Sequence, residues 1–126
     1  MGLAMTLTMT LEQRITAKWT PKTLGEKQEL FALLIYKLQG YIISEGYDIR
    51  LGHAFRCENC VTGSRNSNHK LKLALDINLF KAGQFLQQTA DHKPFGEFWE
   101  SLHPLCRWGG RFNDGNHYSL EHQGRK

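Results

Sequence analysis

The run from Leu71 to Phe80, LKLALDINLF, most constrains what this chain can fold into. All its odd positions are apolar, and positions 72 to 78 carry lysine, alanine, aspartate and asparagine at the even places. Such alternation is typical of a β-strand with one face in the core. A helix is the competing interpretation, because leucine and alanine favour helices. The unbroken series of apolar odd positions favours the strand.

Two further strands and the connecting loops are predicted from the same kind of pattern. The segment Tyr47–Arg56 also alternates, and His117–Leu120 predicts a last short strand. Asparagine, serine and glycine are frequent in Cys57–Asn68, and glycine and asparagine occur in Trp108–Asn116, so both segments are predicted to be loops. A turn is expected at Lys81–Gly83.

Helices are predicted before and between these strands. In Glu26–Glu45 the apolar residues recur at the spacing of one helical face, and Gly46 fits the position that ends a helix. Lys93–Leu105 has a proline near its first turn and is a second predicted helix. A short helix near Thr10–Trp19 is expected within an N-terminal arm, residues 1–25. The order of elements predicts an α+β fold: a small antiparallel β-sheet with flanking helices.

The size and composition limit the classes of protein that the chain could belong to. At 126 residues, with 40% hydrophobic and 22% charged residues, we expect one folded domain over residues 1–126. The net charge of +4 would favour polyanionic partners such as nucleic acid, an anionic membrane or an anionic cell wall. No apolar run approaches the roughly 20 residues of a membrane-spanning helix, so no stable membrane insertion is expected. The first residues do not resemble a signal peptide, so we expect the chain in the cytoplasm.

Three cysteines cannot form a dense disulfide framework. Cys57 and Cys60 form a C-x-x-C pair inside a predicted loop, where they are either free thiols or a reversible local disulfide. A zinc-ribbon module that binds nucleic acid would need two more ligands and stacking aromatic residues beside its basic ones. The segment offers only Phe55 for stacking, so no nucleic-acid partner is expected.

Three residues could form a metal site. Asp76 occupies the polar face of the predicted strand 71–80, His69 lies shortly before it, and His117 opens the last strand. An aspartate there could also simply face water. His69 and Asp76 differ in parity, so they converge only if the strand begins after His69 or is bulged. Two histidines and one carboxylate, with a fourth position open, are the pattern of a catalytic zinc, and Asp114 could serve as a nearby general base.

Three motifs together resemble a family of zinc peptidases. They are S-x-H-x6-D at residues 67–76, W-G-G at 108–110 and D-x-x-H at 114–117. In this order they resemble the D-alanyl-D-alanine carboxypeptidase and L-alanyl-D-glutamate endopeptidase family, which includes VanY-type carboxypeptidases and phage endolysins. The resemblance extends over about residues 26–122. It implies the fold that these peptidases share with hedgehog signalling domains.

The resemblance also implies roles for individual residues. Zn²⁺ would be held by His69, Asp76 and His117, and Asp114 would be the catalytic base that activates water. Arg56 would be a catalytic and substrate-binding residue, contacting a substrate carboxylate or the developing oxyanion.

Two more residues are implied on the substrate side, and two positions depart from the family pattern. Ser67 would steady the loop or the substrate, and Trp108 would wall the cleft. Ser119 stands where many members have glutamate, and Leu73 replaces a glycine of a G-x-A-x-D motif. Neither departure touches a predicted metal ligand.

The expected function is hydrolysis of an amide bond in the peptide stem of bacterial peptidoglycan. A phage-type L-alanyl-D-glutamate endopeptidase (an endolysin) is the first expectation, and a D,D- or L,D-carboxypeptidase is the alternative. Such an enzyme, expected to be a monomer, would reach the wall after the inner membrane is permeabilised. A zinc-containing binding domain without catalysis is the alternative from another class. An HNH-type nuclease would need a ββα-metal arrangement that the sequence does not show.

Overall fold

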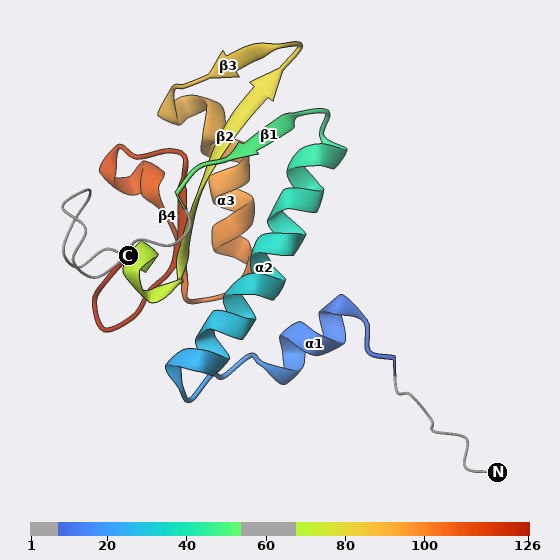
Figure 1. Cartoon of the computed structure of the whole chain (residues 1–126), viewed down its shortest axis with the longest axis vertical. Helices are drawn as coiled ribbons and strands as arrows, with labels where there is room; N and C mark the ends of the chain where they lie inside the picture. The colour runs from blue at the N-terminus through green and yellow to red at the C-terminus, as the bar shows by residue number, and fades with distance from the viewer. Residues whose placement is uncertain (1–7, 54–67) are drawn as a thin grey trace.

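Figure 1 shows the computed structural model of the chain, in which residues 8–53 and 68–126 are described. The α-helices are α1 (Leu11–Ala17), α2 (Leu24–Ser44) and α3 (Lys93–Leu102). Three short 3₁₀ helices are η1 (Asn68–Leu71), η2 (Thr89–His92) and η3 (Gly109–Phe112). The strands are β1 (Asp48–Leu51), β2 (Ala74–Lys81), β3 (Gln84–Leu86), β4 (Cys106–Trp108) and β5 (His117–Leu120). This is the predicted α+β fold.

The strands form one antiparallel sheet in the order β1-β2-β5-β4, and β3 also pairs with β2. The register between β2 and β5 decides which side chains share a face. Asp76 on β2 is directly opposite His117 on β5, and Leu75 is opposite Tyr118. Because neighbouring residues of a strand point to opposite faces, Asp76 and His117 share one face of the sheet, and Leu75 and Tyr118 share the other.

The second of these faces is covered by helices. In Figure 1, α2 and α3 run beside each other along the sheet, and α1 lies against α2. Trp99 of α3 contacts Phe31 of α2 and Tyr118 of β5 edge to face. The apolar odd residues of β2 and one stripe of α2 are buried in this core, as the sequence pattern predicts: Leu75, Ile77 and Leu79, with Leu30, Phe31, Leu34, Ile35, Leu38 and Ile42.

Several element boundaries differ from the prediction for local reasons. The strand predicted at 71–80 begins at Ala74, because Asn68–Leu71 forms η1 and Lys72 has a positive φ of 58°. The helix predicted to reach Leu105 ends at Leu102, because His103 precedes a proline and is extended. The strand predicted at 47–56 is described only from Asp48 to Leu51.

Other boundaries match the prediction or extend it. Helix α2 begins two residues earlier than expected, since the Thr23 hydroxyl accepts a hydrogen bond from the Glu26 amide. Gly46 has a φ of 91°, which suits a residue that ends a helix. The predicted turn joins β2 to β3, with positive φ at Ala82 and Gly83. Such a pair of positive φ values matches the twist of a tight hairpin.

None of the helices in the described part of the chain combines the length and hydrophobicity that a membrane crossing requires.

Gly96 leads to the first testable prediction, because a side chain there would collide with Trp108. A Cβ at Gly96 would lie 2.0 Å from Cδ2 of that indole, and both residues are buried. We expect Gly96→Ala to lower the free energy of unfolding by about 1–3 kcal/mol. Chemical denaturation measures this value. The matched control is Gly40→Ala in exposed helix, where a Cβ meets nothing within 4 Å and should add about 1 kcal/mol of stability.

Candidate metal centre

Three side chains converge on the open face of the sheet. His69 comes from η1, Asp76 from β2 and His117 from β5, and one ligand atom of each lies within 4.8 Å of the others. Nε2 of His69 lies 3.1 Å from Oδ1 of Asp76, and Nδ1 of His117 lies 3.5 Å from the same oxygen. Among the described residues 8–53 and 68–126, His69, Asp76 and His117 form the group of metal-ligating side chains that lie close enough together to hold an ion.

The local structure explains why these three meet. Asp76 and His117 are cross-strand partners, and the Cβ atoms of such pairs are about 5 Å apart. His69 precedes the strand and lies in η1, so the strand alternation does not fix its direction. The difference in parity between His69 and Asp76 is therefore no obstacle, because the strand begins after His69.

The surroundings keep Asp76 ionised. Burial alone would raise the pKa of its carboxyl group. Hydrogen bonds from His117 and His69, together with the charge that these imidazoles can carry, outweigh this effect and hold the pKa of Asp76 well below its usual value. A carboxylate that stays charged and half-buried suits the binding of a cation.

The hydrogen bonding of His117 orients its other nitrogen. Its Nε2 lies 3.2 Å from the backbone oxygen of Lys126, which can only accept a hydrogen bond. Nε2 therefore carries a proton, and Nδ1, which faces the carboxylate of Asp76, is the nitrogen that a bound ion would take as its ligand. Metal-binding histidines commonly donate their second nitrogen to a backbone carbonyl in this way.

The donor set fits Zn²⁺. Two imidazoles and one carboxylate are the ligands of open catalytic zinc sites, whereas an oxygen-rich set would favour calcium or magnesium. His69 and His117 are almost fully buried, at 2% and 5% exposure, which limits their freedom and holds them in place. These three residues are therefore the ones that could hold the ion, with one position left for water or substrate.

The loop before His117 brings Asp114 to the site. The amide of Asp114 donates to the Gly109 carbonyl, and the amide of His117 donates to the Asp114 carbonyl. A Cβ at Gly109 would lie 2.1 Å from the Asp114 carbonyl oxygen, so only glycine permits this approach. The side chain of Asp114 is exposed and is not part of the three-residue donor group. The structure thus joins Asp114 to His117 through the backbone, and its role as the catalytic base stays a prediction.

Trp108 is hydrogen-bonded to this loop and packs against it. Its Nε1 donates to the Gly115 carbonyl at 2.8 Å, and the indole is only 4% exposed. A Cβ at Gly110 would lie 2.2 Å from the indole ring. The W-G-G motif thus has a packing role here, while contact between Trp108 and substrate stays a prediction.

Four residues singled out in the sequence lie outside the described residues: Arg56, Cys57, Cys60 and Ser67. Their predicted roles stay predictions. Ser119, at a position where the sequence departs from the family pattern, is fully buried on β5.

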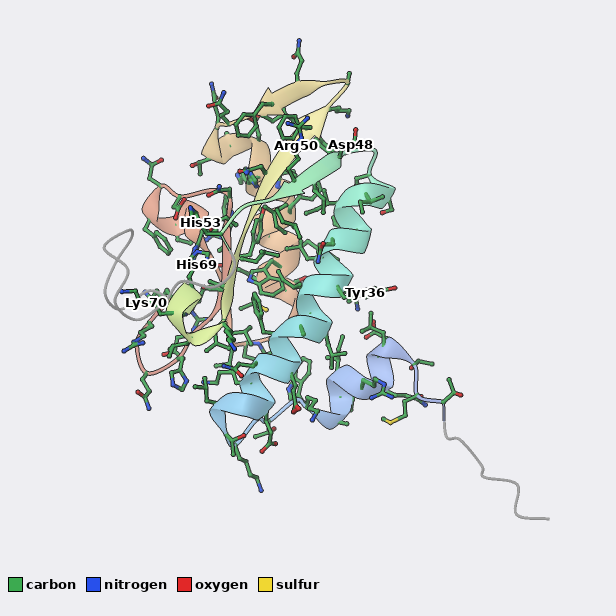
Figure 2. All side chains as sticks on the ribbon, in the orientation of Figure 1. Tyr36, Asp48, Arg50, His53, His69 and Lys70 are labelled. Carbon is green, nitrogen blue, oxygen red and sulfur yellow. The ribbon has the colours of Figure 1, made fainter. Side chains whose placement is uncertain are left out.

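The structure adds two histidines that sequence reasoning did not connect with the site. His53 lies beside His69, with ring centroids 6.4 Å apart, and Figure 2 shows both at the same end of the sheet. The backbone of His53 accepts a hydrogen bond from the amide of Asp76 at 2.8 Å. His92 is buried in η2, with Nδ1 2.8 Å from the hydroxyl of Tyr118. The position of His53 could have been inferred from the pairing of β1 with β2. No local sequence pattern indicates the position of His92.

His92 should make the stability of the protein depend on pH. Burial lowers the pKa of its imidazole from the usual value to about 4, although the charge of Asp91 opposes this shift. Between pH 6.5 and 4 the unfolded chain therefore takes up a proton that the folded chain does not. We expect the metal-free protein to lose about 3 kcal/mol through this group as the pH falls across that window.

Urea denaturation of wild type and His92→Phe at several pH values, with chelator present, measures this contribution. The variant should show a flatter dependence between pH 6.5 and 4, because phenylalanine takes up no proton. Parallel curves for the two proteins would contradict the assignment.

Comparison with known protein families bears on this site. Residues 61–120 match the family described as D-alanyl-D-alanine carboxypeptidase. The matched segment contains all three donor residues, the W-G-G motif and Asp114, and it confirms the resemblance seen in the sequence. No curated protein sequence gives a significant match to the chain.

Proposed function

From its match to the D-alanyl-D-alanine carboxypeptidase family, which supports a peptidase, we propose that the chain is a zinc-dependent enzyme that hydrolyses an amide bond in the peptide stem of peptidoglycan. The observation that carries the proposal is the convergence of His69, Asp76 and His117 within 4.8 Å on the open face of the sheet. The family match supports the substrate class, and the three donor residues support a binding site for the ion.

Zn²⁺ bound there would supply a Lewis acid that polarises an amide carbonyl and lowers the pKa of water. The rest of the chemistry falls to the residues of the chain. We assign the role of base to the exposed carboxylate of Asp114, three residues before His117, which would accept a proton from water as it attacks the amide carbon. The same group can return that proton to the nitrogen of the leaving amine, so the cycle ends with Asp114 ionised again.

The proposed task is cleavage of the L-alanyl-D-glutamate bond, the reaction of a phage-type endolysin. Removal of a terminal D-alanine by a carboxypeptidase is the second candidate, because the matched family carries that description. A carboxypeptidase needs a fixed cation for the terminal carboxylate of its substrate, and Arg56 is the residue proposed for it.

Digestion of purified peptidoglycan, followed by mass spectrometry of the released peptides, tests both candidates. New peptides that begin with D-glutamate identify the endopeptidase, and peptides shortened by one terminal alanine identify the carboxypeptidase. Each product should require added Zn²⁺ and disappear with chelator. Intact stems after incubation with the zinc-loaded protein would refute the proposed function.

A further inference from the structure

A polar cavity of about 210 Å³ lies next to the metal centre. Asn78, which lines it, is two residues from Asp76 on the same face of β2, and Asp114 and Asn116 line it from the loop before His117. Thr89 and His92 close it from η2. The cavity therefore shares Asp114 with the proposed catalytic site.

His92 lines this cavity and can offer it a hydrogen-bond donor. The hydroxyl of Tyr118 is buried in the core, and His92 Nδ1 is its hydrogen-bond partner within the described residues. A buried hydroxyl needs an acceptor for its proton, so Tyr118 donates to Nδ1 and the proton of the neutral imidazole is on Nε2. Because Nδ1 is turned to the core, Nε2–H is the polar group that His92 can offer to the cavity. Burial also lowers the pKa of His92 to about 4, which keeps it neutral near pH 7.

The other polar groups of the lining complement this donor. Nδ2 of Asn116 donates to Oδ1 of Asn78 at 3.1 Å. The amide oxygen of Asn116 and the carboxylate of Asp114 are acceptors of the lining, whose neutral donors include Nδ2 of Asn78, the Thr89 hydroxyl and the side-chain amides of Gln87 and Asn113. No lysine or arginine lines the cavity within the described residues. A carboxamide can pair with both the donors and the acceptors of this lining, whereas a carboxylate can only accept and would bring a second negative charge beside Asp114 without a compensating cation.

We propose that this cavity is a substrate subsite that binds an uncharged carboxamide of the stem peptide, with His92 Nε2–H donating to the carbonyl oxygen and Asn116 and Asp114 accepting from the amide nitrogen. The subsite rests on the proposed function and refines it. It distinguishes stems whose D-glutamyl α-carboxyl group is amidated from stems in which that group is a free carboxylate. The discrimination is strong because a wrong group leaves polar atoms of the lining unpaired.

Two synthetic stem peptides that differ only in this group, carboxamide or carboxylate, test the proposal with the zinc-loaded protein. Wild type should cleave the carboxamide peptide with a kcat/KM at least about tenfold higher, mostly through KM. His92→Phe keeps an aromatic ring but removes the Nε2–H donor, together with the Nδ1 acceptor of Tyr118, so the preference should fall to within about twofold while zinc affinity stays close to wild type. Asn116→Ala should reduce the preference in the same direction. Lys93→Ala, an exposed substitution outside the cavity, is the matched control and should retain it.

Equilibrium binding of the same two peptides, made with a non-hydrolysable scissile bond, separates the subsite from the activity. A wild-type preference for the carboxamide peptide that is lost in folded His92→Phe supports the subsite even if nothing is cleaved, and only the proposed function then fails. Equal affinity of wild type for the two peptides, or an unchanged preference in both cavity variants, overturns the subsite even if cleavage is confirmed.

Discussion

His117→Ala is expected to abolish zinc binding and peptide cleavage together. The substitution removes one of the three donors that converge on the open face of the sheet and leaves Asp76 with a single imidazole partner. An ion that contributes several kcal/mol to the reaction is then lost, so cleavage should fall by at least about a thousandfold. Metal content after dialysis against limiting Zn²⁺, measured beside the cleavage rate, checks both parts.

Thermal unfolding gives a readout that does not depend on activity. A ligand at 100 times its dissociation constant stabilises the folded state by about 2.7 kcal/mol, so added Zn²⁺ should raise the melting temperature of wild type. His117→Ala should show no such rise. His122→Ala is the matched control, because that histidine pairs with Lys27 and lies outside the donor group. Zinc stabilisation that survives in His117→Ala would show that the ion binds elsewhere.

The largest features of the fold could be predicted from the sequence because they depend on periodicity. The alternation in β2 and the helical stripe in α2 each report which face is buried, and the core is built from those residues. The strands β3 and β4 have three residues each, which is too short for an alternating pattern to be distinguished from a loop. Their place in the sheet depends on pairing with distant strands, and a single sequence does not display that pairing.

The residues of the candidate site also fall into those that could be predicted from the sequence and those that could not. His69, Asp76 and His117 could be predicted because their spacing and residue types carry the chemistry, although their parity disagreed with one continuous strand. The 3₁₀ turn at residues 68–71 resolves that disagreement. The role of His92 could not be predicted, since it depends on the cavity and on a hydrogen bond to Tyr118, which is 26 residues away in the chain. Isolated histidines acquire a role only through such tertiary contacts.

Asp114→Asn is expected to lower kcat for peptide cleavage by about 10²–10⁴-fold while zinc affinity stays close to wild type. The amide keeps the size and the hydrogen-bonding reach of the carboxylate but cannot accept a proton from water. Because the side chain is exposed and outside the three-residue donor group, the free energy of unfolding should change little. Cleavage of a synthetic stem peptide under zinc-saturating conditions measures kcat, and a metal titration measures the affinity.

The contrast between these two variants separates the two roles that this site requires. His117→Ala should lose the ion and the reaction, whereas Asp114→Asn should lose only the reaction, because the proposed function assigns metal binding to the first residue and proton transfer to the second. Asp48→Asn, an exposed aspartate at the start of β1 (Figure 2), is the control for loss of a negative charge and should leave kcat unchanged. If Asp114→Asn instead cleaves at the wild-type rate, the base is another group; if it fails to bind zinc, Asp114 contributes to the metal site itself.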